Sequence, residues 1–370
     1  MKGRRPRPLD DGDSGEVRVS VELSRAKLIN KIGAISSLRL IVRQLAIMTV
    51  ISDCTASALK DAAASLMAGN LVAFPTETVY GLGADACNEK AVARIYEVKG
   101  RPSDHPLIVH ISSIEQLDKW AKDIPEYAIK LARSFWPGPM TLILPRTDLA
   151  KDFITGGQDN VGIRVPAHTI ALSLLKDFEF QGGYGIAAPS ANRFGKVSPT
   201  NSKDVEDELG EYFSKDDKIL DGGFSKVGIE STIINCTELR PVILRPGQIT
   251  DEMVETTLSI NLERSDSTIS NIKSSGLLDA HYSPNAKVVL EGSPKPGDGL
   301  IAFAHIPTPV GVIRLASPKN EKEYAQMLYS AFRQADHKGI KVIRVIPPVA
   351  QGLGKAIVNR LTKASYKQIS

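Results

Sequence analysis

The sequence lacks the features that mark several protein classes. It has three cysteines, Cys54, Cys87 and Cys236, and no Cys-x-x-Cys pair, which excludes a zinc ribbon or a thioredoxin-type motif and indicates a reducing compartment. No run of 18 uncharged apolar residues occurs, so we expect no membrane span and a cytoplasmic location. The sequence also has no G-x-x-x-x-G-K-[ST] or G-x-S-x-G motif. A P-loop and a serine-hydrolase elbow are therefore excluded.

Excess positive charge is confined to the N-terminus. Residues 1–47 carry a net charge of +5, and the other 323 residues carry −1. The main part of the chain is therefore not a general nucleic-acid-binding surface. We expect residues 1–50 to be a disordered extension, or the true start to be Met48, because the acidic residues argue against a transit peptide.

The apolar pattern predicts two α/β domains in the 370 residues. Residues 51–250 alternate short strands and helices: Thr55 is expected to cap a helix through Leu66, and residues 89–98 to form another. The glycine-rich stretch from Gly81 to Cys87 is predicted to be a loop. Residues 251–286 are rich in Ser, Thr, Asn and Asp and are predicted to be a linker. Residues 287–370 again alternate strands and helices, which indicates a small parallel α/β domain.

Hydroxyl-bearing side chains follow the first predicted strand of the larger domain. Residues 75–83 read PTETVYGLG directly after it, and ligands bind at strand ends in open α/β sheets. A polar turn explains the same composition. Gly81-x-Gly83-x-x-Ala86 is a weak match to a dinucleotide fingerprint, since no helix begins at its third position.

Two cations flank a glycine after the second predicted helix. Lys99 offers a point charge and Arg101 a planar fork, and together they predict a site for a polyphosphate. Helix-terminal cations that interact with the helix dipole are the alternative. His105 and His110 have no third partner in the sequence, so we expect no metal site.

Further polar segments stand at later strand ends, and the whole series resembles one family. Each segment alone is compatible with an ordinary turn. In order, however, the segments resemble the YrdC-type threonylcarbamoyl-AMP synthase family over residues 60–250: PTETVYGLG, KGRPSDHPLIVH, WPGPMTLIL, VGIRVP, APSANRFGKVSPT, GIESTI and LRPG. Residues 281–284 (HYSP) and 352–361 (GLGKAIVNRL) resemble the linker motif and closing helix of its two-domain members.

The resemblance implies a fold and a reaction. It implies a YrdC-like twisted, open mixed sheet with helices, a linker that can act as a lid, and a Rossmann-like C-terminal domain. The family joins L-threonine, bicarbonate and ATP to give threonylcarbamoyl-AMP and pyrophosphate. A partner transferase complex then modifies tRNAs that read ANN codons. Mg²⁺ would travel on the phosphates, because no carboxylate cluster is evident.

The resemblance also implies roles for individual residues. Lys99 and Arg101 are the expected catalytic residues, which would hold the triphosphate. The expected ATP-binding residues are Arg101, His105, Asn160, Ser190, Asn192, Ser198, Arg245 and Tyr282. The expected L-threonine-binding residues are Thr78, His110, Arg164, Ala188 and Ser231. At His105 this chain departs from the family, which commonly has Asn there, although either side chain can donate a hydrogen bond.

Two other functions compete with this one. An RNA-binding module, with weak tRNA contact, is disfavoured because residues 48–370 carry a net charge of −1 and show no interleaving of aromatic and basic residues. A carbamoyl transferase acting on another acceptor usually carries zinc-finger-like cysteines, and this sequence has none.

Overall fold

The computed structural model describes residues 51–262 and 282–366. The expected extension, residues 1–50, lies outside this range, as do His281 and most of the predicted linker. Within the described residues, no helix is both long and apolar enough to cross a membrane.

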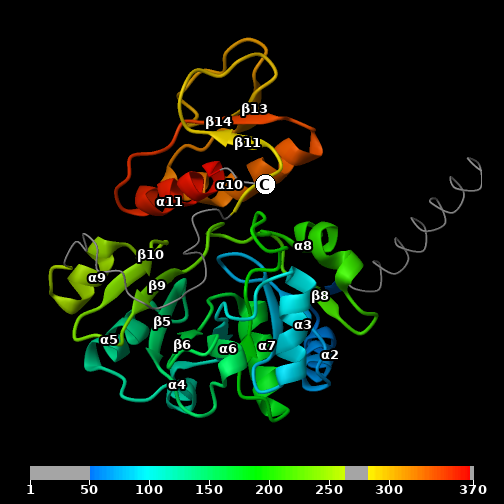
Figure 1. Ribbon diagram of the computed structural model, residues 1–370, viewed down its shortest axis with the longest axis vertical. Coiled ribbons are helices and arrows are strands. Elements are labelled where there is room, and N and C mark those ends of the chain that lie inside the picture. Colours follow the sequence, from blue (N-terminus) through cyan, green and yellow to red (C-terminus); the bar gives the residue numbers. More distant parts are fainter. Residues whose placement is uncertain (1–50, 263–281, 367–370) are drawn as a thin grey trace, which may run out of the picture. The chain divides into compact units, whose positions relative to one another are not determined.

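The larger domain is built on one ten-stranded mixed sheet, which confirms the predicted fold class (Figure 1). Its strand order is β1-β8-β2-β3-β7-β4-β6-β5-β9-β10. The strands are β1 (Ile51–Asp53), β2 (Val72–Phe74), β3 (Gly81–Asp85), β4 (Ile108–His110), β5 (Met140–Pro145), β6 (Asn160–Arg164), β7 (Ile186–Ala187), β8 (Lys218–Asp221), β9 (Thr232–Asn235) and β10 (Val242–Arg245).

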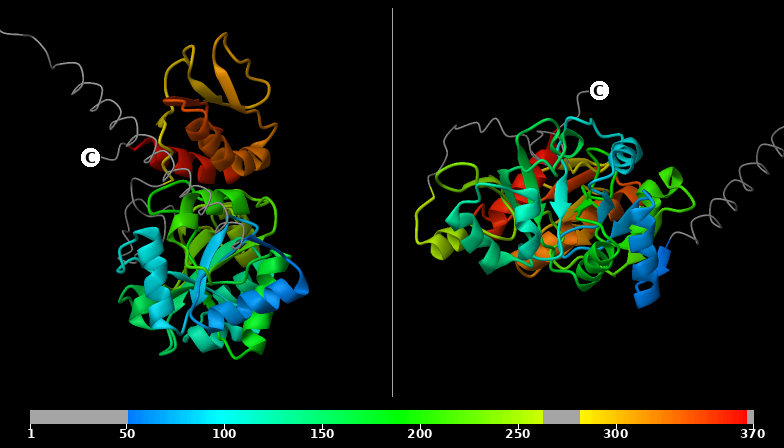
Figure 2. Two further views of the ribbon diagram at one scale, coloured as in Figure 1. Left: turned by 90° about the vertical axis from the view of Figure 1, so that its right-hand side faces the viewer. Right: turned by 90° about the horizontal axis from the view of Figure 1, so that it is seen from below.

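Helices cover both faces of this sheet. They are α2 (Ala56–Met67), α3 (Glu89–Lys99), α4 (Leu117–Trp120), α5 (Glu126–Phe135), α6 (Asp152–Thr155), α7 (Thr169–Phe180), α8 (Ser202–Leu209) and α9 (Asp251–Leu258). Along β2, Ala73 packs into one apolar cluster, whereas Val72 and Phe74 pack into the other, as the alternation of a strand requires. The first cluster includes α3 and the second includes α2 and α7, and Figure 2 shows α2 and α3 on opposite sides of the strands.

The chemistry of single residues explains two helix ends, of which the Thr55 cap was predicted. Thr55 caps α2 by accepting a hydrogen bond from the backbone N–H of Ala58 at 3.2 Å. Gly100 ends α3 with a φ of 60°, the left-handed conformation that glycine adopts without strain. The chain therefore turns sharply between Lys99 and Arg101.

The prediction of a loop from Gly81 to Cys87 was wrong for Gly81–Asp85. This segment forms β3, which pairs antiparallel with both β2 and β7. A Cβ at Gly83 would lie 2.7 Å from Ile186 Cγ2 and 2.9 Å from the Phe74 ring. Glycine is here because neighbouring side chains cross the strand closely, not because the chain turns.

The predicted linker begins with a helix. Thr250 caps α9 through the backbone N–H of Met253 at 3.4 Å, and the buried Val254 contributes to the main core. This helix packs against α5. Residues 251–258 therefore belong to the larger domain rather than to a connection between domains.

The C-terminal domain has a four-stranded parallel sheet of order β11-β14-β12-β13. Its elements are β11 (Lys287–Val289), β12 (Gly299–Ile301), β13 (Ile313–Ala316), α10 (Glu321–His337), β14 (Val342–Val345) and α11 (Leu353–Ser365). Both helices lie on one side of the sheet (Figure 2). The apolar cluster of this domain includes Val79, Val197 and Ile229 from the larger domain, so the two domains share a core.

Candidate active site

One pocket collects most of the predicted site residues. Its cavity volume is about 50 Å³, and the pocket is partly open to solvent. The pocket is lined by Thr76, Thr78, Val79, Tyr80, Gly81, Arg101, Ile108, His110, Arg164, Ala188, Pro189, Ser190, Glu230, Ser231, Arg245 and Tyr282. Nine of the predicted residues are in this set: Thr78, Arg101, His110, Arg164, Ala188, Ser190, Ser231, Arg245 and Tyr282.

Strand pairing explains why His110 and Arg164 meet. The strands β4 and β6 are parallel, and His110 and Arg164 are paired partners at their C-terminal ends. Paired residues place their side chains on the same face of a sheet. Polar side chains that are 54 positions apart in the sequence thus reach one wall of the pocket.

Arg164 is anchored by a buried carboxylate. Its Nη2 lies 2.7 Å from Oε1 of Glu77, and both side chains are almost fully buried. The other oxygen of Glu77 accepts a hydrogen bond from the backbone N–H of Ala167 at 3.0 Å. Glu77 lies within the PTETVYGLG segment, but its pairing with Arg164 could not be predicted from that segment.

His110 is buried and neutral. Burial, together with the nearby Arg164, lowers the pKa of His110 to about 3. Its ring packs edge-on against Phe74 with the ring centroids 5.8 Å apart. Its Nδ1 is buried and forms no hydrogen bond within the described residues, so it is available to a ligand.

Hydroxyl groups line the two sides of the pocket. The Ser231 hydroxyl lies 2.8 Å from that of Thr141 and accepts a hydrogen bond from Arg245 Nη2 at 3.1 Å. The Thr78 hydroxyl lies 2.8 Å from that of Thr76, whose own hydroxyl donates to the carbonyl of Val79. These bonds fix hydroxyl groups that point toward the pocket.

Arg101 reaches the pocket, whereas Lys99 lies behind it. Arg101 donates to the carbonyl of Pro106 at 3.0 Å, and burial lowers its pKa to about 10. Lys99 Nζ donates instead to the carbonyls of Ser190, at 2.5 Å, and of Asn192. Burial, and then the charge of Arg101, lower the pKa of Lys99 well below its usual value. Within the described residues, no carboxylate forms an ion pair with Lys99.

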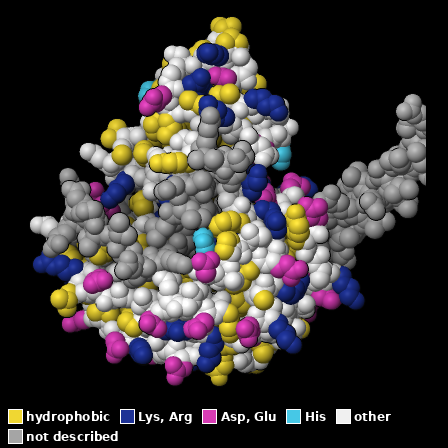
Figure 3. All heavy atoms as spheres, in the orientation of Figure 1, with side chains coloured by type: hydrophobic (Ala, Val, Ile, Leu, Met, Phe, Trp, Pro, Cys, Tyr) yellow, Lys and Arg dark blue, Asp and Glu magenta, His cyan; other side chains and the backbone are white. Residues whose placement is uncertain are grey.

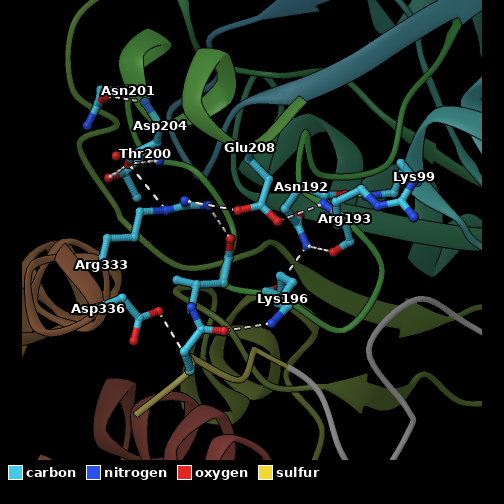
Figure 4. A network of polar contacts seen from close by, with 12 residues as sticks. Lys99, Asn192, Arg193, Lys196, Thr200, Asn201, Asp204, Glu208, Arg333 and Asp336 are labelled. Atoms are coloured by element: carbon cyan, nitrogen blue, oxygen red, sulfur yellow. Dashed lines mark hydrogen bonds and ion pairs between the residues drawn. The ribbon is translucent and has the colours of Figure 1, made fainter. Parts of the chain in front are cut away.

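Four other predicted residues do not line the pocket. Asn192 donates to the carbonyls of Arg193 and Lys196 and so shapes the loop after β7, as Figure 4 shows. Ser198 donates to Glu230 at 2.6 Å. His105 packs against Phe194. Asn160 stands at the opposite end of β6 from Arg164 and lines another hollow.

Two residues on the pocket wall have unexpected surroundings. Glu230, which sequence reasoning missed, accepts hydrogen bonds from Tyr329 and Arg360 of the C-terminal domain. Tyr282 stacks on Tyr329 with the ring centroids 5.8 Å apart, and the Arg360 guanidinium lies 5.4 Å from the Tyr282 ring. Tyr282 also has a φ of 63°, an uncommon conformation for a bulky residue.

No metal-binding cluster is visible in residues 51–262 and 282–366: no three His, Cys, Asp or Glu side chains gather in ligand geometry. None of the three cysteines forms a disulfide within the described residues. The pocket offers three arginine cations, hydroxyls, one neutral imidazole and the carboxylate of Glu230 as its chemical groups.

Two family models match consecutive parts of the chain. Residues 64–247 match the Sua5/YciO/YrdC model, which is described as telomere recombination. Residues 249–365 match a model described as threonylcarbamoyl-AMP synthase, C-terminal domain.

Curated relatives and a solved structure agree with these models. A threonylcarbamoyl-AMP synthase of Pyrococcus abyssi is 43% identical and aligns over 83% of this chain and 94% of the relative. A threonylcarbamoyl-AMP synthase of Bacillus subtilis is 41% identical, over 82% and 92%. The crystal structure of P. abyssi Sua5 complexed with L-threonine matches with a TM-score of 0.76 and 40% identity, covering 85% of this chain and 97% of that one.

Proposed function

Since the chain belongs to the threonylcarbamoyl-AMP synthase family, we propose that its pocket joins L-threonine, bicarbonate and ATP into threonylcarbamoyl-AMP and releases pyrophosphate. The observation that carries this proposal is the meeting, in one pocket, of Arg101, Arg164 and Arg245 with His110 and Ser231. An amino acid and a nucleotide both need anchoring cations, and this pocket supplies three.

The β4–β6 wall is suited to threonine. Arg164 is oriented by Glu77, so its planar guanidinium can bind a carboxylate with the remaining N–H groups. His110, being neutral, acts as a hydrogen-bond partner and not as a general base near pH 7. Thr78, Ala188 and Ser231 complete this side of the pocket. Together these groups would orient the threonine amine for attack on carbon dioxide or bicarbonate.

The opposite side is suited to ATP. The carbamate oxygen attacks the α-phosphorus and pyrophosphate leaves, so negative charge must be neutralised. We assign Arg101, Ser190, Arg245 and Tyr282 to direct contact, because they line the pocket. Lys99, Asn192 and Ser198 hold the same wall from behind, and a shift of the loop after β7 would be needed to expose Lys99. His105 and Asn160 stay as predicted ATP contacts that lie outside the pocket in this state.

Space in the pocket argues for movement on binding. The cavity of about 50 Å³ is small for a nucleotide and threonine, and since the pocket is partly open to solvent, the ligands would extend out of it unless the wall moves. Tyr282, with its uncommon backbone conformation, is the wall residue that we expect to move. This supports the idea that the segment around residue 282 covers the ligands after they bind.

Several finer statements belong to the same proposal. Mg²⁺ would enter with the phosphates, since phosphate oxygens are its usual ligands and no carboxylate cluster is present in the described residues. The product would pass to a tRNA-modifying transferase, and a cytoplasmic location is part of the same proposal. In Figure 3, acidic and basic side chains are interspersed on the visible face of the larger domain, which gives no support to a nucleic-acid surface there.

Pyrophosphate release is the decisive measurement. We expect ATP to be converted to pyrophosphate only when L-threonine and bicarbonate are both present. Release that is independent of threonine would contradict the proposal. Formation of threonylcarbamoyl-AMP, followed by chromatography, identifies the product directly.

A further inference from the structure

An acidic side chain lines a pocket that is proposed to bind a triphosphate. Among the lining residues, the other ionised groups are Arg101, Arg164 and Arg245, and Glu230 alone is negative. An uncompensated carboxylate there would repel ATP. Because ligand binding at this wall depends on its charge, the groups that neutralise Glu230 matter for function.

The principal neutralising group comes from the C-terminal domain. Arg360 of α11 is fully buried, and its Nε donates to Oε2 of Glu230 at 2.9 Å. Its Nη1 donates to the carbonyl of Pro246 at 2.8 Å, which holds the guanidinium in place. Tyr329 of α10 donates to the same carboxylate oxygen at 3.0 Å, and Ser198 donates to the other oxygen at 2.6 Å.

The charges around Glu230 act together. The titratable groups that face it are Arg245 of β10, Tyr282, Tyr329 of α10 and Arg360 of α11. Burial alone raises the pKa of the Glu230 carboxyl, but Arg360, Arg245 and the Ser198 hydrogen bond outweigh burial, so the pKa lies below its usual value. Glu230 is therefore ionised and paired. Without Arg360, fewer positive charges would oppose the effect of burial, so the pKa of the Glu230 carboxyl would rise.

We propose that Arg360 is a positioning residue of the ATP site, which neutralises Glu230 across the domain interface and so keeps the pocket cationic. The C-terminal domain thus sets the charge of a pocket that it does not line. This inference rests on the proposed function in one respect only, namely that ATP binds in this pocket.

A second buried arginine of the same interface provides a matched control. Arg333 of α10 donates to the carbonyl of Val197 at 2.5 Å and pairs with Glu208 at 3.3 Å (Figure 4). Its partners Glu208 and Asp204 lie outside the pocket. Replacing Arg333 removes one buried interface charge and leaves Glu230 paired.

The test compares Arg360→Met with Arg333→Met between pH 6.5 and 9. The KM for ATP is measured by pyrophosphate release, and each value is divided by that of the unaltered enzyme at the same pH, which cancels the titration of ATP itself. We expect Arg360→Met to raise this ratio by about 10- to 100-fold at high pH, the range that one uncompensated charge beside an ionised group produces. The ratio should fall toward low pH, where Glu230 becomes protonated and neutral. Arg333→Met should give a ratio that does not change with pH.

Two further variants complete the test. Arg360→Lys retains the charge and should recover most of the ATP affinity. The double variant Glu230→Gln/Arg360→Met removes both charges, so the dependence on pH should disappear. If Arg360→Met does not fold, the double variant decides, because a pH-dependent ratio without Glu230 would refute the proposal. Equal, pH-independent ratios for Arg360→Met and Arg333→Met would also refute it.

Failure of the proposed function gives a different result. If the unaltered enzyme binds ATP but releases no pyrophosphate with threonine, the reaction is wrong. The affinities of the same variants for ATP, measured by calorimetry, would still test Arg360.

Discussion

Every residue that lines the pocket lies in residues 76–245 or is Tyr282, whereas α10 and α11 contribute groups that touch those residues from behind. The larger domain supplies its ligand-facing groups from strand ends and loops of a mixed sheet. The C-terminal domain presents two helices and supplies Tyr329, Arg333 and Arg360. The difference teaches that contact with a ligand and control over the contacting groups can be divided between domains.

The largest expected effect on activity comes from replacing Arg101, a ligand-facing residue of the larger domain. Arg101→Ala should lower the rate of threonylcarbamoyl-AMP formation by about 10²–10³-fold, the typical cost of losing one preorganised charge contact. Because Arg101 also donates to Pro106, we expect a loss of about 1 kcal/mol in the free energy of unfolding. Product formation and urea denaturation measure the two quantities. Activity within twofold of the unaltered enzyme would remove Arg101 from the site.

Lys99→Met tests whether Lys99, two positions before Arg101, supports the pocket wall or contacts the ligand. The variant loses two hydrogen bonds to the loop after β7, so about 1–3 kcal/mol of stability should be lost. If Lys99 only holds the loop, the KM for ATP rises by about tenfold or less. A loss of activity as large as that of Arg101→Ala, in a protein of nearly normal stability, would show that Lys99 contacts phosphate as the sequence predicts.

His110 should make the larger domain sensitive to acid. Its pKa of about 3 lies below that of an unfolded histidine, so the unfolded chain binds the extra proton and stability falls as the pH falls below about 6.5. One such group accounts for up to about 1.4 kcal/mol per pH unit between pH 6 and pH 4. Urea denaturation of His110→Gln over this range should show a correspondingly smaller slope. An identical slope would mean that His110 is not the acid-sensitive group.

The smallest expected effect is at the interface. Tyr329→Phe removes one hydrogen bond to Glu230 while Arg360 remains, so about 1 kcal/mol of stability should be lost, with a change in the KM for ATP of threefold or less. A change in ATP affinity of tenfold or more would mean that Tyr329 contributes as much as Arg360 to offsetting the charge of Glu230.

The sequence was most informative where a residue's role is local. Thr55 caps α2 as predicted, and the helix predicted over residues 89–98 is α3, which Gly100 ends through its left-handed backbone conformation. It was misleading at Gly81–Asp85, where glycines accommodate the Phe74 and Ile186 side chains within a strand. The helix α7 was not predicted, because no side-chain cap marks its start.

Motif spacing brought most site residues together but did not fix side-chain direction. Lys99 and Arg101 are two positions apart, yet one lies behind the pocket and the other lines it. Asn160 and Arg164 share a short strand, and only the end bearing Arg164 reaches the pocket. The contacts of Glu230 with Tyr329 and Arg360 span 99 and 130 positions, and no local pattern reports such pairs.

That separation of 130 positions has a consequence for synthesis of the protein. At about 5–20 residues per second, a ribosome needs roughly 7–26 seconds to reach Arg360 after it has added Glu230. During this interval Glu230 lacks its main counter-charge, although Ser198 and Arg245 of the larger domain already face it. The set of groups that neutralises Glu230 is therefore incomplete until α11 docks. On the proposal made above for Arg360, full affinity for ATP develops only after α11 has been synthesised and has docked.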